Sequence, residues 1–203
     1  GMFADAAIFS FHPVKHIACG EGGMITTNDS EIYKKLLLLR SHGITKDPNA
    51  LIESHGDWYY EMQSLGYNYR MPDLLCALGI SQLDRAEENL ISRRKIAKKY
   101  FKAFSGIPIT IPKSSLHPGH AFHLFVIQVE ERKAFYDYLK EKGINAQIHY
   151  IPVHKQPYYI EQYGEQVFKH AEEYYERCIS IPIYPSLSNN DQVSLIKAVV
   201  SCS

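Results

Sequence analysis

Short runs of β-prone residues alternate with helical segments along this chain, and this alternation restricts its fold more than any other feature. The runs are apolar and too short for helices, so they are best interpreted as strands. Strands that alternate with helices are typical of α/β or α+β domains. The expected strands are 6–11, 24–27, 122–129 and 146–150, and the expected helices are 31–40, 73–83, 86–104, 131–142, 167–177 and 190–200.

The long helix expected at 86–104 precedes the one domain boundary that we predict. Gly106, Ile107 and Pro108 end this helix, and the composition changes after them. A chain of 203 residues is long enough for one large domain or two small ones. We therefore predict two domains, 1–105 and 106–203, of which the second is a small αβ unit.

Composition indicates an ordinary soluble globular protein, because apolar residues make up 45% and charged residues 22% of the chain. Basic and acidic residues both number 22, which argues against a nucleic-acid partner bound through a broad basic surface. A stretch of five basic residues lies in the middle of the expected long helix, and we expect them to form a solvated face. They are Arg93, Arg94, Lys95, Lys98 and Lys99.

The cysteines and the apolar runs bear on the location of the protein. The 4 cysteines are scattered and form no CxxC pair, so we expect reduced thiols in a cytoplasmic protein. The longest aliphatic run, 36–39, is far too short to span a bilayer, and we expect no membrane partner.

A lysine just after the first expected strand is the main chemical candidate. A neutral amine at Lys15 can attack a carbonyl carbon and form a Schiff base. Ser10 offers a hydroxyl suited to a phosphate, and Gly20, Gly22 and Gly23 allow the backbone to approach a ligand closely. On chemistry alone, an ordinary exposed loop lysine is the commoner explanation, because lysines near Gly-rich turns are frequent.

Several motifs occur in the order found in one known family. They are SFHPVK at 10–15, GEGG at 20–23, GYNYRM at 66–71, GISQL at 79–83, QIHYIPVH at 147–154, QPY at 156–158 and IPIYPSL at 181–187. Together they resemble the DegT/StrS-type sugar aminotransferases, which are fold-type I enzymes that use pyridoxal phosphate. The resemblance covers nearly the whole chain. It implies the C-terminal part of such an enzyme, with a remnant of the large cofactor-binding domain over 1–105 and the small αβ domain over 106–203.

The resemblance also implies roles for residues near the cofactor. Lys15 matches the lysine that holds pyridoxal phosphate as a Schiff base and later moves the proton. Ser10 matches a hydroxyl that contacts the cofactor phosphate. Asn68 matches an asparagine that reaches across a dimer interface to the phosphate bound by the other subunit. Arg70 supports that interface or an anionic substrate group, unless it is a structural surface arginine.

Three residues in the second half are expected to contact the substrate. His149, Tyr150 and His154 lie around the end of an expected strand, near the cleft that the resemblance implies. Family members act on nucleotide-linked keto-deoxysugars for surface polysaccharides, typically with glutamate as the amino donor. These compounds are the small molecules that we expect this chain to bind.

The resemblance raises a question about independent activity. Family members carry a long segment before the lysine loop that supplies an Asp for the cofactor ring nitrogen, and we expect the chain to be a poor catalyst without it. The chain then forms a homodimer or complements a separate N-terminal half. The alternatives are a non-catalytic remnant that associates through the family dimer interface, and a binding module without cofactor.

Three histidines at intervals of three form a candidate metal site. They are His117, His120 and His123. Pro118 and Gly119 prevent a regular helix from setting their geometry, and no carboxylate or cysteine completes the set. We expect a structural role for this segment and no metal.

Overall fold

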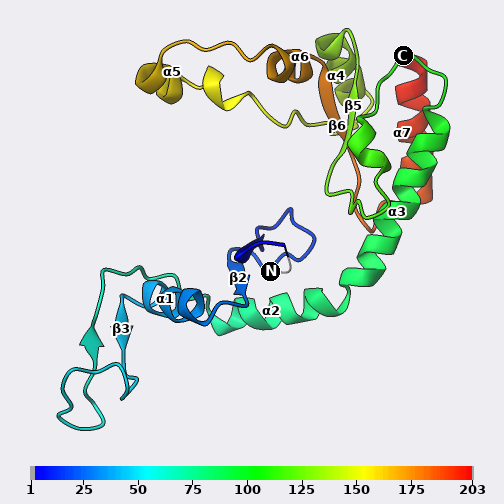
Figure 1. Ribbon diagram of the computed structural model, residues 1–203. Helices are drawn as coiled ribbons and strands as arrows, with labels where there is room; N and C mark the ends of the chain where they lie inside the picture. Colours follow the sequence, from blue (N-terminus) through cyan, green and yellow to red (C-terminus); the bar gives the residue numbers. More distant parts are fainter. Residues whose placement is uncertain (1–2, 203) are drawn as a thin grey trace. The chain divides into compact units, whose positions relative to one another are not determined.

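The computed structural model describes residues 3–202, with the side chains of residues 114 and 116 left out. The chain divides into two compact units, residues 1–86 and 87–203 (Figure 1). In the described part, strands pair as three two-stranded antiparallel sheets among helices, which agrees with the expected mixture of α and β structure. The division between residues 105 and 106, which concerns the family's large and small domains, stays a prediction.

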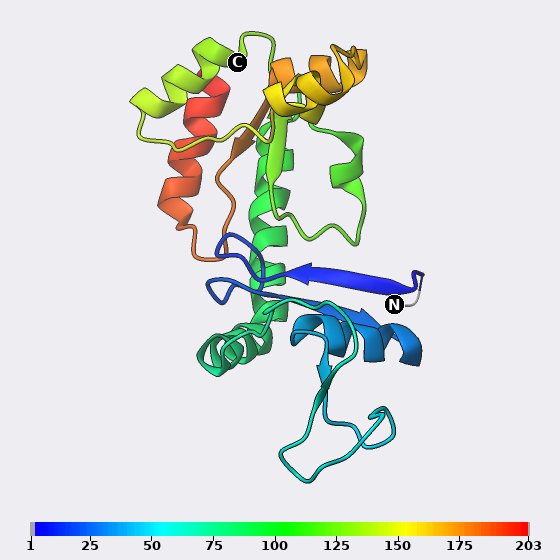
Figure 2. The same ribbon diagram turned by 90° about the vertical axis from the view of Figure 1, so that its left-hand side faces the viewer.

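The first unit is built on a hairpin of two strands, β1 (Ala6–Ser10) and β2 (Gly23–Thr27). The strands pair antiparallel with Ser10 opposite Gly23, and Figure 2 shows them side by side. Helix α1 (Ser30–Arg40) begins where the Asp29 carboxylate accepts two backbone N–H bonds. Helix α2 (Asp73–Asp84) follows Pro72. These four elements confirm the ranges expected from the sequence.

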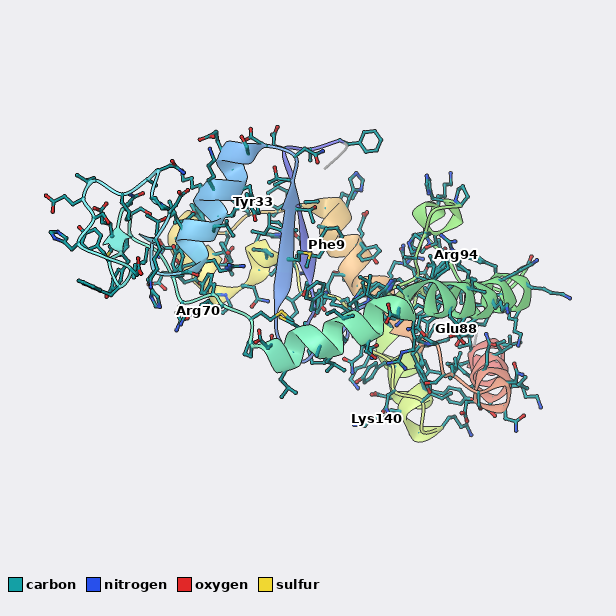
Figure 3. The ribbon with its side chains drawn as sticks, turned by 90° about the horizontal axis from the view of Figure 1, so that it is seen from below. Phe9, Tyr33, Arg70, Glu88, Arg94 and Lys140 are labelled. Atoms are coloured by element: carbon teal, nitrogen blue, oxygen red, sulfur yellow. The ribbon has the colours of Figure 1, made fainter. Side chains whose placement is uncertain are left out.

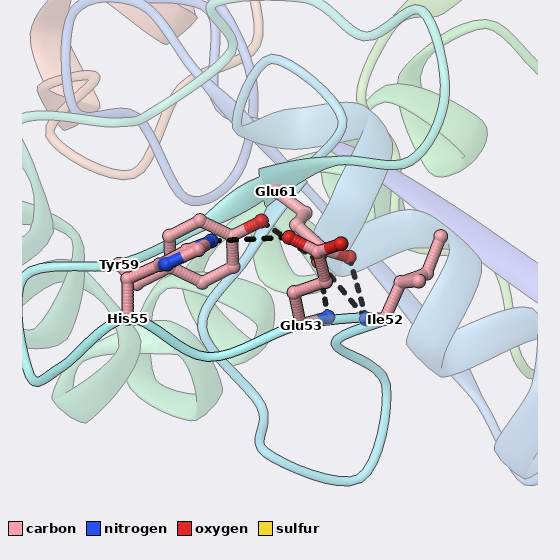
Figure 4. A network of polar contacts seen from close by, with 5 residues as sticks. All are labelled: Ile52, Glu53, His55, Tyr59 and Glu61. Carbon is pink, nitrogen blue, oxygen red and sulfur yellow. Dashed lines mark hydrogen bonds and ion pairs between the residues drawn. The ribbon is translucent and has the colours of Figure 1, made fainter.

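Between α1 and α2 the chain forms a folded arm, residues 44–62, that begins and ends in the two-residue strands β3 (Ile44–Thr45) and β4 (Glu61–Met62). The Glu61 carboxylate organises it (Figure 4). It accepts hydrogen bonds from the backbone N–H groups of Ile52 and Glu53, each at 2.9 Å, and from the Tyr59 hydroxyl at 3.1 Å. The two backbone bonds, followed by the Tyr59 bond, hold the pKa of Glu61 below its usual value.

The first unit buries very little of its apolar surface. Among its described residues only Cys19 has a buried apolar side chain, and neither α1 nor α2 contains a buried residue. Large apolar residues of the hairpin and of both helices are instead exposed, with Ile8 81% accessible. Figure 3 labels two of them, Phe9 on β1 and Tyr33 on α1. An isolated two-stranded hairpin is only marginally stable in water, so this unit requires a further apolar partner.

The second unit contains the long helix and all of the chain after it. Its elements are α3 (Ala86–Ala103), η1 (Lys113–Leu116), β5 (Phe125–Gln128), α4 (Arg132–Glu141), η2 (Val153–Lys155), α5 (Pro157–Tyr163), α6 (Lys169–Arg177), β6 (Cys178–Ile181) and α7 (Asn189–Cys202). Strands β5 and β6 pair antiparallel, with Phe125 opposite Ile181.

One hydrophobic core joins helices α3, α4 and α7 of the second unit to its sheet. It includes Ile96 and Tyr100 from α3, together with Phe125 from β5 and Ile179 from β6. Helix α4 packs against both α7 and β6, and Leu139 is its most deeply buried residue. The Tyr100 hydroxyl donates to the carbonyl of Pro182 at 2.7 Å, which satisfies its polar group.

The basic residues of α3 do not all face solvent, which corrects the expected solvated face. Arg93 is only 7% accessible, and its Nη1 donates to the carbonyls of Phe122 at 3.0 Å and Ile183 at 2.8 Å. Arg94, labelled in Figure 3, donates through Nε to the carbonyl of His120 at 3.2 Å. Arg93 lies three residues before Ile96, on the buried face of the helix. Burial lowers the pKa of its guanidinium.

The sequence prediction differs from the structure at three elements of the second unit. The strand expected at 146–150 forms only one bridge, between Gln147 and Ser180. Strand β6 is not among the expected strands, because it is only four residues long and follows α6 with no turn residue between them. Helix α5, in a Pro- and Tyr-rich stretch, also lies outside the expected helices.

Among the described residues, no helix is both long enough and apolar enough to cross a bilayer.

Candidate active site

The lysine loop connects the two strands of the first hairpin. Phe11 N donates to Gly22 O at 2.9 Å, and Cys19 N donates to Phe11 O at 3.0 Å, so the loop closes on itself just beyond β1. Lys15 is half-buried, and its backbone N–H donates to His12 O at 2.9 Å. Within residues 3–202, its ammonium group has no hydrogen-bond or ion-pair partner. The loop therefore holds the lysine backbone and leaves its amine available.

Glycines at the base of the loop are required by the geometry. A Cβ on residue 23 would lie 2.7 Å from Phe9 O across the hairpin. Gly22 has a φ of +143° and lies close to the side chain of Met71. A larger residue at 23 would therefore push the two strands apart beside Ser10, and one at 22 would be strained by its φ.

The loop is anchored to α2 through Cys19. A Cβ on Gly79 of α2 would lie 3.8 Å from Cys19 Cβ, an ordinary van der Waals distance, so α2 passes close to the loop. Burial, and secondarily the charges of Cys76 and Glu21, raises the pKa of the Cys19 thiol. A buried thiol that stays protonated is a poor nucleophile, so Cys19 serves packing. The motif at 79–83 thus begins where α2 meets the lysine loop.

The segment that carries Asn68 and Arg70 is fixed to the C-terminal end of α1. Tyr67 N donates to Leu39 O at 2.7 Å, and Asn68 forms an antiparallel bridge with Ser41. A Cβ on Gly66 would lie 2.2 Å from Gly43 N, so no other residue fits there. Asn68 and Arg70 are both exposed, and Figure 3 labels Arg70.

His149 and Tyr150 lie beside strand β6 in the second unit. His149 Nδ1 is 2.8 Å from the hydroxyl oxygen of Ser180. The rings of His149 and Tyr150 meet edge to face at 4.6 Å, and Tyr150 is exposed. The histidine ring is thus oriented by the strand, and the tyrosine ring rests on it.

His154 belongs to a separate polar cluster between η2 and α6. Its Nε2 is 3.0 Å from Glu172 Oε1, while Lys155 Nζ is 2.7 Å from Glu172 Oε2. The backbone N–H of Phe168 also donates to Glu172, at 3.0 Å. The hydrogen bonds from Lys155, then His154 and Phe168, lower the pKa of Glu172 to about 2. The carboxylate is therefore charged throughout the physiological range.

His154 also lines a pocket of the second unit. The pocket has a volume of about 260 Å³, and its walls are mostly aromatic. They comprise Val153, His154, Tyr159, Tyr163, Gly164, Gln166 and Phe168.

The three evenly spaced histidines show no metal-binding arrangement. His117 Nδ1 accepts a hydrogen bond from Gly119 N, and His120 Nδ1 accepts one from Phe122 N. These local bonds stabilise the loop before β5. In the described residues no group of three or more His, Cys, Asp or Glu side chains could hold a metal ion.

The sequence profile of the DegT/DnrJ/EryC1/StrS aminotransferase family matches residues 1–200. The chain belongs to this family. The spore coat polysaccharide biosynthesis protein SpsC of Bacillus subtilis is 43% identical over 209 residues, which cover 98% of this chain and 54% of SpsC. The UDP-4-amino-4,6-dideoxy-N-acetyl-beta-L-altrosamine transaminase of Campylobacter jejuni is 38% identical, over 94% of this chain and 50% of that enzyme. The chain thus spans about half the length of these curated relatives.

Solved structures of DegT-family proteins share the fold. Helicobacter pylori PseC, an aminotransferase involved in the biosynthesis of pseudoaminic acid, superposes with a TM-score of 0.89 at 32% identity. The superposition covers 98% of this chain and 53% of PseC. The putative sugar aminotransferase Spr1654 of Streptococcus pneumoniae, in its PMP form, also gives 0.89, at 30% identity and with the same coverage. The fold is therefore that of about half of a fold-type I transferase, as the motifs predicted.

Aminotransferases of the DegT family depend on pyridoxal phosphate, and part of this chain fits that cofactor. Lys15 presents an unpaired amine, which suits the cofactor carbonyl, and Ser10 presents an exposed hydroxyl at the end of β1, which suits the phosphate. Both groups stand on the same hairpin, five residues apart.

The sequence motifs found the lysine loop but missed the groups that hold the second unit's histidines. Ser180 contacts His149, Glu172 contacts His154, and Lys155 pairs with Glu172. No pattern in the sequence marks these contacts, because Ser180 and Glu172 lie 31 and 18 residues from their histidines and meet them only after folding.

Proposed function

We propose that this chain supplies the cofactor lysine and part of the substrate site of a pyridoxal-phosphate-dependent aminotransferase. Its substrates would be nucleotide-linked keto-deoxysugars for surface polysaccharides, with glutamate as amino donor. The observation that carries the proposal is the available amine of Lys15 on a rigid hairpin, in a chain that matches the family over residues 1–200. The named activities of the relatives support the substrate class.

The residues of the hairpin have distinct tasks in this proposal. When bound, pyridoxal phosphate supplies a carbonyl carbon that exchanges amines and a ring that accepts electrons. Lys15 Nζ holds the cofactor and, when released, carries the proton as a positioned base. Ser10 Oγ donates to the cofactor phosphate. The glycines at 22 and 23 allow the hairpin to close beside Ser10 and at the base of the loop that carries Lys15.

The remaining proposed residues act on the substrate or on a second subunit. Asn68, held against the end of α1, reaches the cofactor phosphate of the other subunit in a homodimer, and Arg70 beside it supports the interface or an anionic group. His149, Tyr150 and His154 contact the nucleotide sugar. Because the chain spans only about half of its relatives, we expect the 203 residues alone to be a poor catalyst.

Reductive trapping tests the role of Lys15. The chain is incubated with pyridoxal phosphate, reduced with borohydride and mapped by mass spectrometry. We expect the label on Lys15 in preference to other lysines, and its loss in Lys15→Ala. Lys46→Ala is the matched control, since Lys46 is an exposed loop lysine of the same unit.

The same trapping is repeated with the remaining half of the family fold added as a separate polypeptide. Label on Lys15 only in the mixture would support complementation. A full-length relative, treated in the same way, is the positive control. If Lys15 remained unlabelled even in the mixture, while the lysine of that relative was labelled, the proposed function would be wrong.

A non-catalytic role is the second candidate, and the exposed apolar surface of the first unit favours it. Under this alternative, the chain associates through the family dimer interface without binding cofactor. Association without any label on Lys15, alone or in the mixture, would favour this candidate.

A further inference from the structure

Strand β6 is buried on both faces, and the two faces have different tasks. Ile179 and Ile181 belong to the hydrophobic core. Cys178 and Ser180 alternate with them, so they point to the opposite face. Both are buried nonetheless, and Ser180 is 6% accessible.

The segment before η2 pairs with β6 along the edge opposite β5. Gln147 N donates to Ser180 O at 3.0 Å, and Ser180 N donates to Gln147 O at 2.8 Å. This antiparallel bridge places His149, two residues further along the segment, beside β6. The His149 ring thereby lies within hydrogen-bonding distance of the Ser180 hydroxyl.

The contact between the two side chains has a preferred direction. The Ser180 hydroxyl is buried, and His149 Nδ1, at 2.8 Å, is its hydrogen-bond partner. A buried hydroxyl that donates to no acceptor costs free energy, so the favoured arrangement has Ser180 O–H donating to Nδ1. A nitrogen that accepts carries no proton, which places the ring proton of neutral His149 on Nε2.

We infer that Ser180 is a positioning residue for His149, which it fixes as the neutral imidazole with its proton on Nε2. The assignment of the substrate contact rests on the proposed function, whereas the tautomer and the ring orientation do not.

Nitrogen-15 NMR of the 203-residue chain, labelled at histidine, tests the inference. His149→Gln identifies the His149 signals. We expect Nδ1 to show the shift of an unprotonated nitrogen that accepts a hydrogen bond, and Nε2 that of a protonated one. In Ser180→Ala the hydrogen-bond shift of Nδ1 should disappear and the two tautomers should average.

Three further variants separate positioning from simple loss of structure. Ser180→Thr keeps the hydroxyl and should restore the spectrum, and Ser180→Cys serves if the alanine variant does not fold. Ser201→Ala, a matched change at an exposed position of α7, should leave the His149 signals unchanged. A proton on Nδ1 in the unaltered chain, or an unchanged spectrum without the hydroxyl, would overturn the inference. Failure of His149 variants to affect substrate binding in the assembled enzyme would instead count against the proposed function.

Discussion

At the scale of single residues, burial and not charge type determines what the basic side chains do. Arg93 satisfies the carbonyl of Phe122, a residue with a φ of 52° that β-prone side chains rarely adopt. The backbone N–H of Phe122 is satisfied in turn by His120 Nδ1. Two basic or imidazole side chains thus hold one strained backbone position where β5 begins.

Removing the Arg93 guanidinium should destabilise the second unit. Arg93→Ala leaves the carbonyls of Phe122 and Ile183 without their donor, and each buried unsatisfied group costs about 1–3 kcal/mol. We expect the free energy of unfolding to fall by about 3 kcal/mol in urea denaturation followed by amide signals of residues 87–203. Lys95→Ala, on the exposed side of the same helix, is the control. Equal effects of the two changes would show that Arg93 is not a structural anchor.

At the scale of elements, two carboxylates tie segments together that secondary structure does not connect. Glu61 organises the arm of residues 44–62, and Glu172 joins η2 to α6. In each case the charged form accepts several hydrogen bonds, which is why both pKa values are lowered. Protonation of these carboxylates in acid should therefore weaken the arm and the contact between η2 and α6.

The arm offers a direct optical test, because Trp58 is the only tryptophan of the chain and lies within it. A lowered carboxyl pKa means that the charged form stabilises the arm above the ordinary pKa of 4.5, and that this support is lost as pH falls through the lowered value. We expect Trp58 fluorescence anisotropy to fall below that pH, and to be low already at neutral pH in Glu61→Gln.

Glu53→Gln is the control for this experiment, since the Glu53 side chain pairs with His55 and not with the network's centre. An anisotropy in Glu61→Gln equal to that of the unaltered chain at every pH would contradict the role of the carboxylate.

The hydrogen bonds to Glu172 should break at a lower pH than the ordinary carboxyl pKa of 4.5. Their stabilisation is complete above pH 4.5 and is lost as the pH falls towards about 2. The Phe168 amide proton, which donates to Glu172, should therefore shift in NMR with a midpoint near 2. Glu172→Gln should show the acid-like shift at neutral pH, and Glu173→Gln should not. A midpoint near 4.5 would refute the cluster as described.

At the scale of the whole molecule, the two units differ in how much of their apolar surface they bury. The second unit has a continuous core, while the described part of the first leaves most large apolar side chains accessible. Exposed apolar patches of this kind mark association surfaces. The exposed apolar residues of the hairpin and helices accord with a chain that spans about half the length of its relatives.

We therefore expect the chain to associate with itself when no other partner is present. Sedimentation velocity should show dimers or larger assemblies whose share grows with concentration. Ile8→Asp places a charge on the exposed hairpin and should shift the distribution to smaller species, whereas Asn28→Asp adds the same charge at an exposed polar site. A chain that sediments as a monomer at high concentration would contradict this expectation.

Local signals predicted most of the elements, because caps, glycines and periodic apolar residues act within a few positions. The helix at 31–40 and the two strands on either side of the lysine loop were predicted from such signals. Strand β6 was not, because it is only four residues long and follows α6 with no turn residue between them. Arg93 was misassigned, although its spacing from Ile96 placed it on the buried face.

The sequence by itself determined the family, the lysine loop and the mixture of α and β structure, since each depends on residue types at short spacing. Only the tertiary structure decided which polar groups meet: Ser180 with His149, Glu172 with His154, and Arg93 with two carbonyls. These pairs join residues 18 to 90 positions apart, and no local pattern specifies them. They form because burial requires every polar group to find a partner, and packing determines which one is within reach.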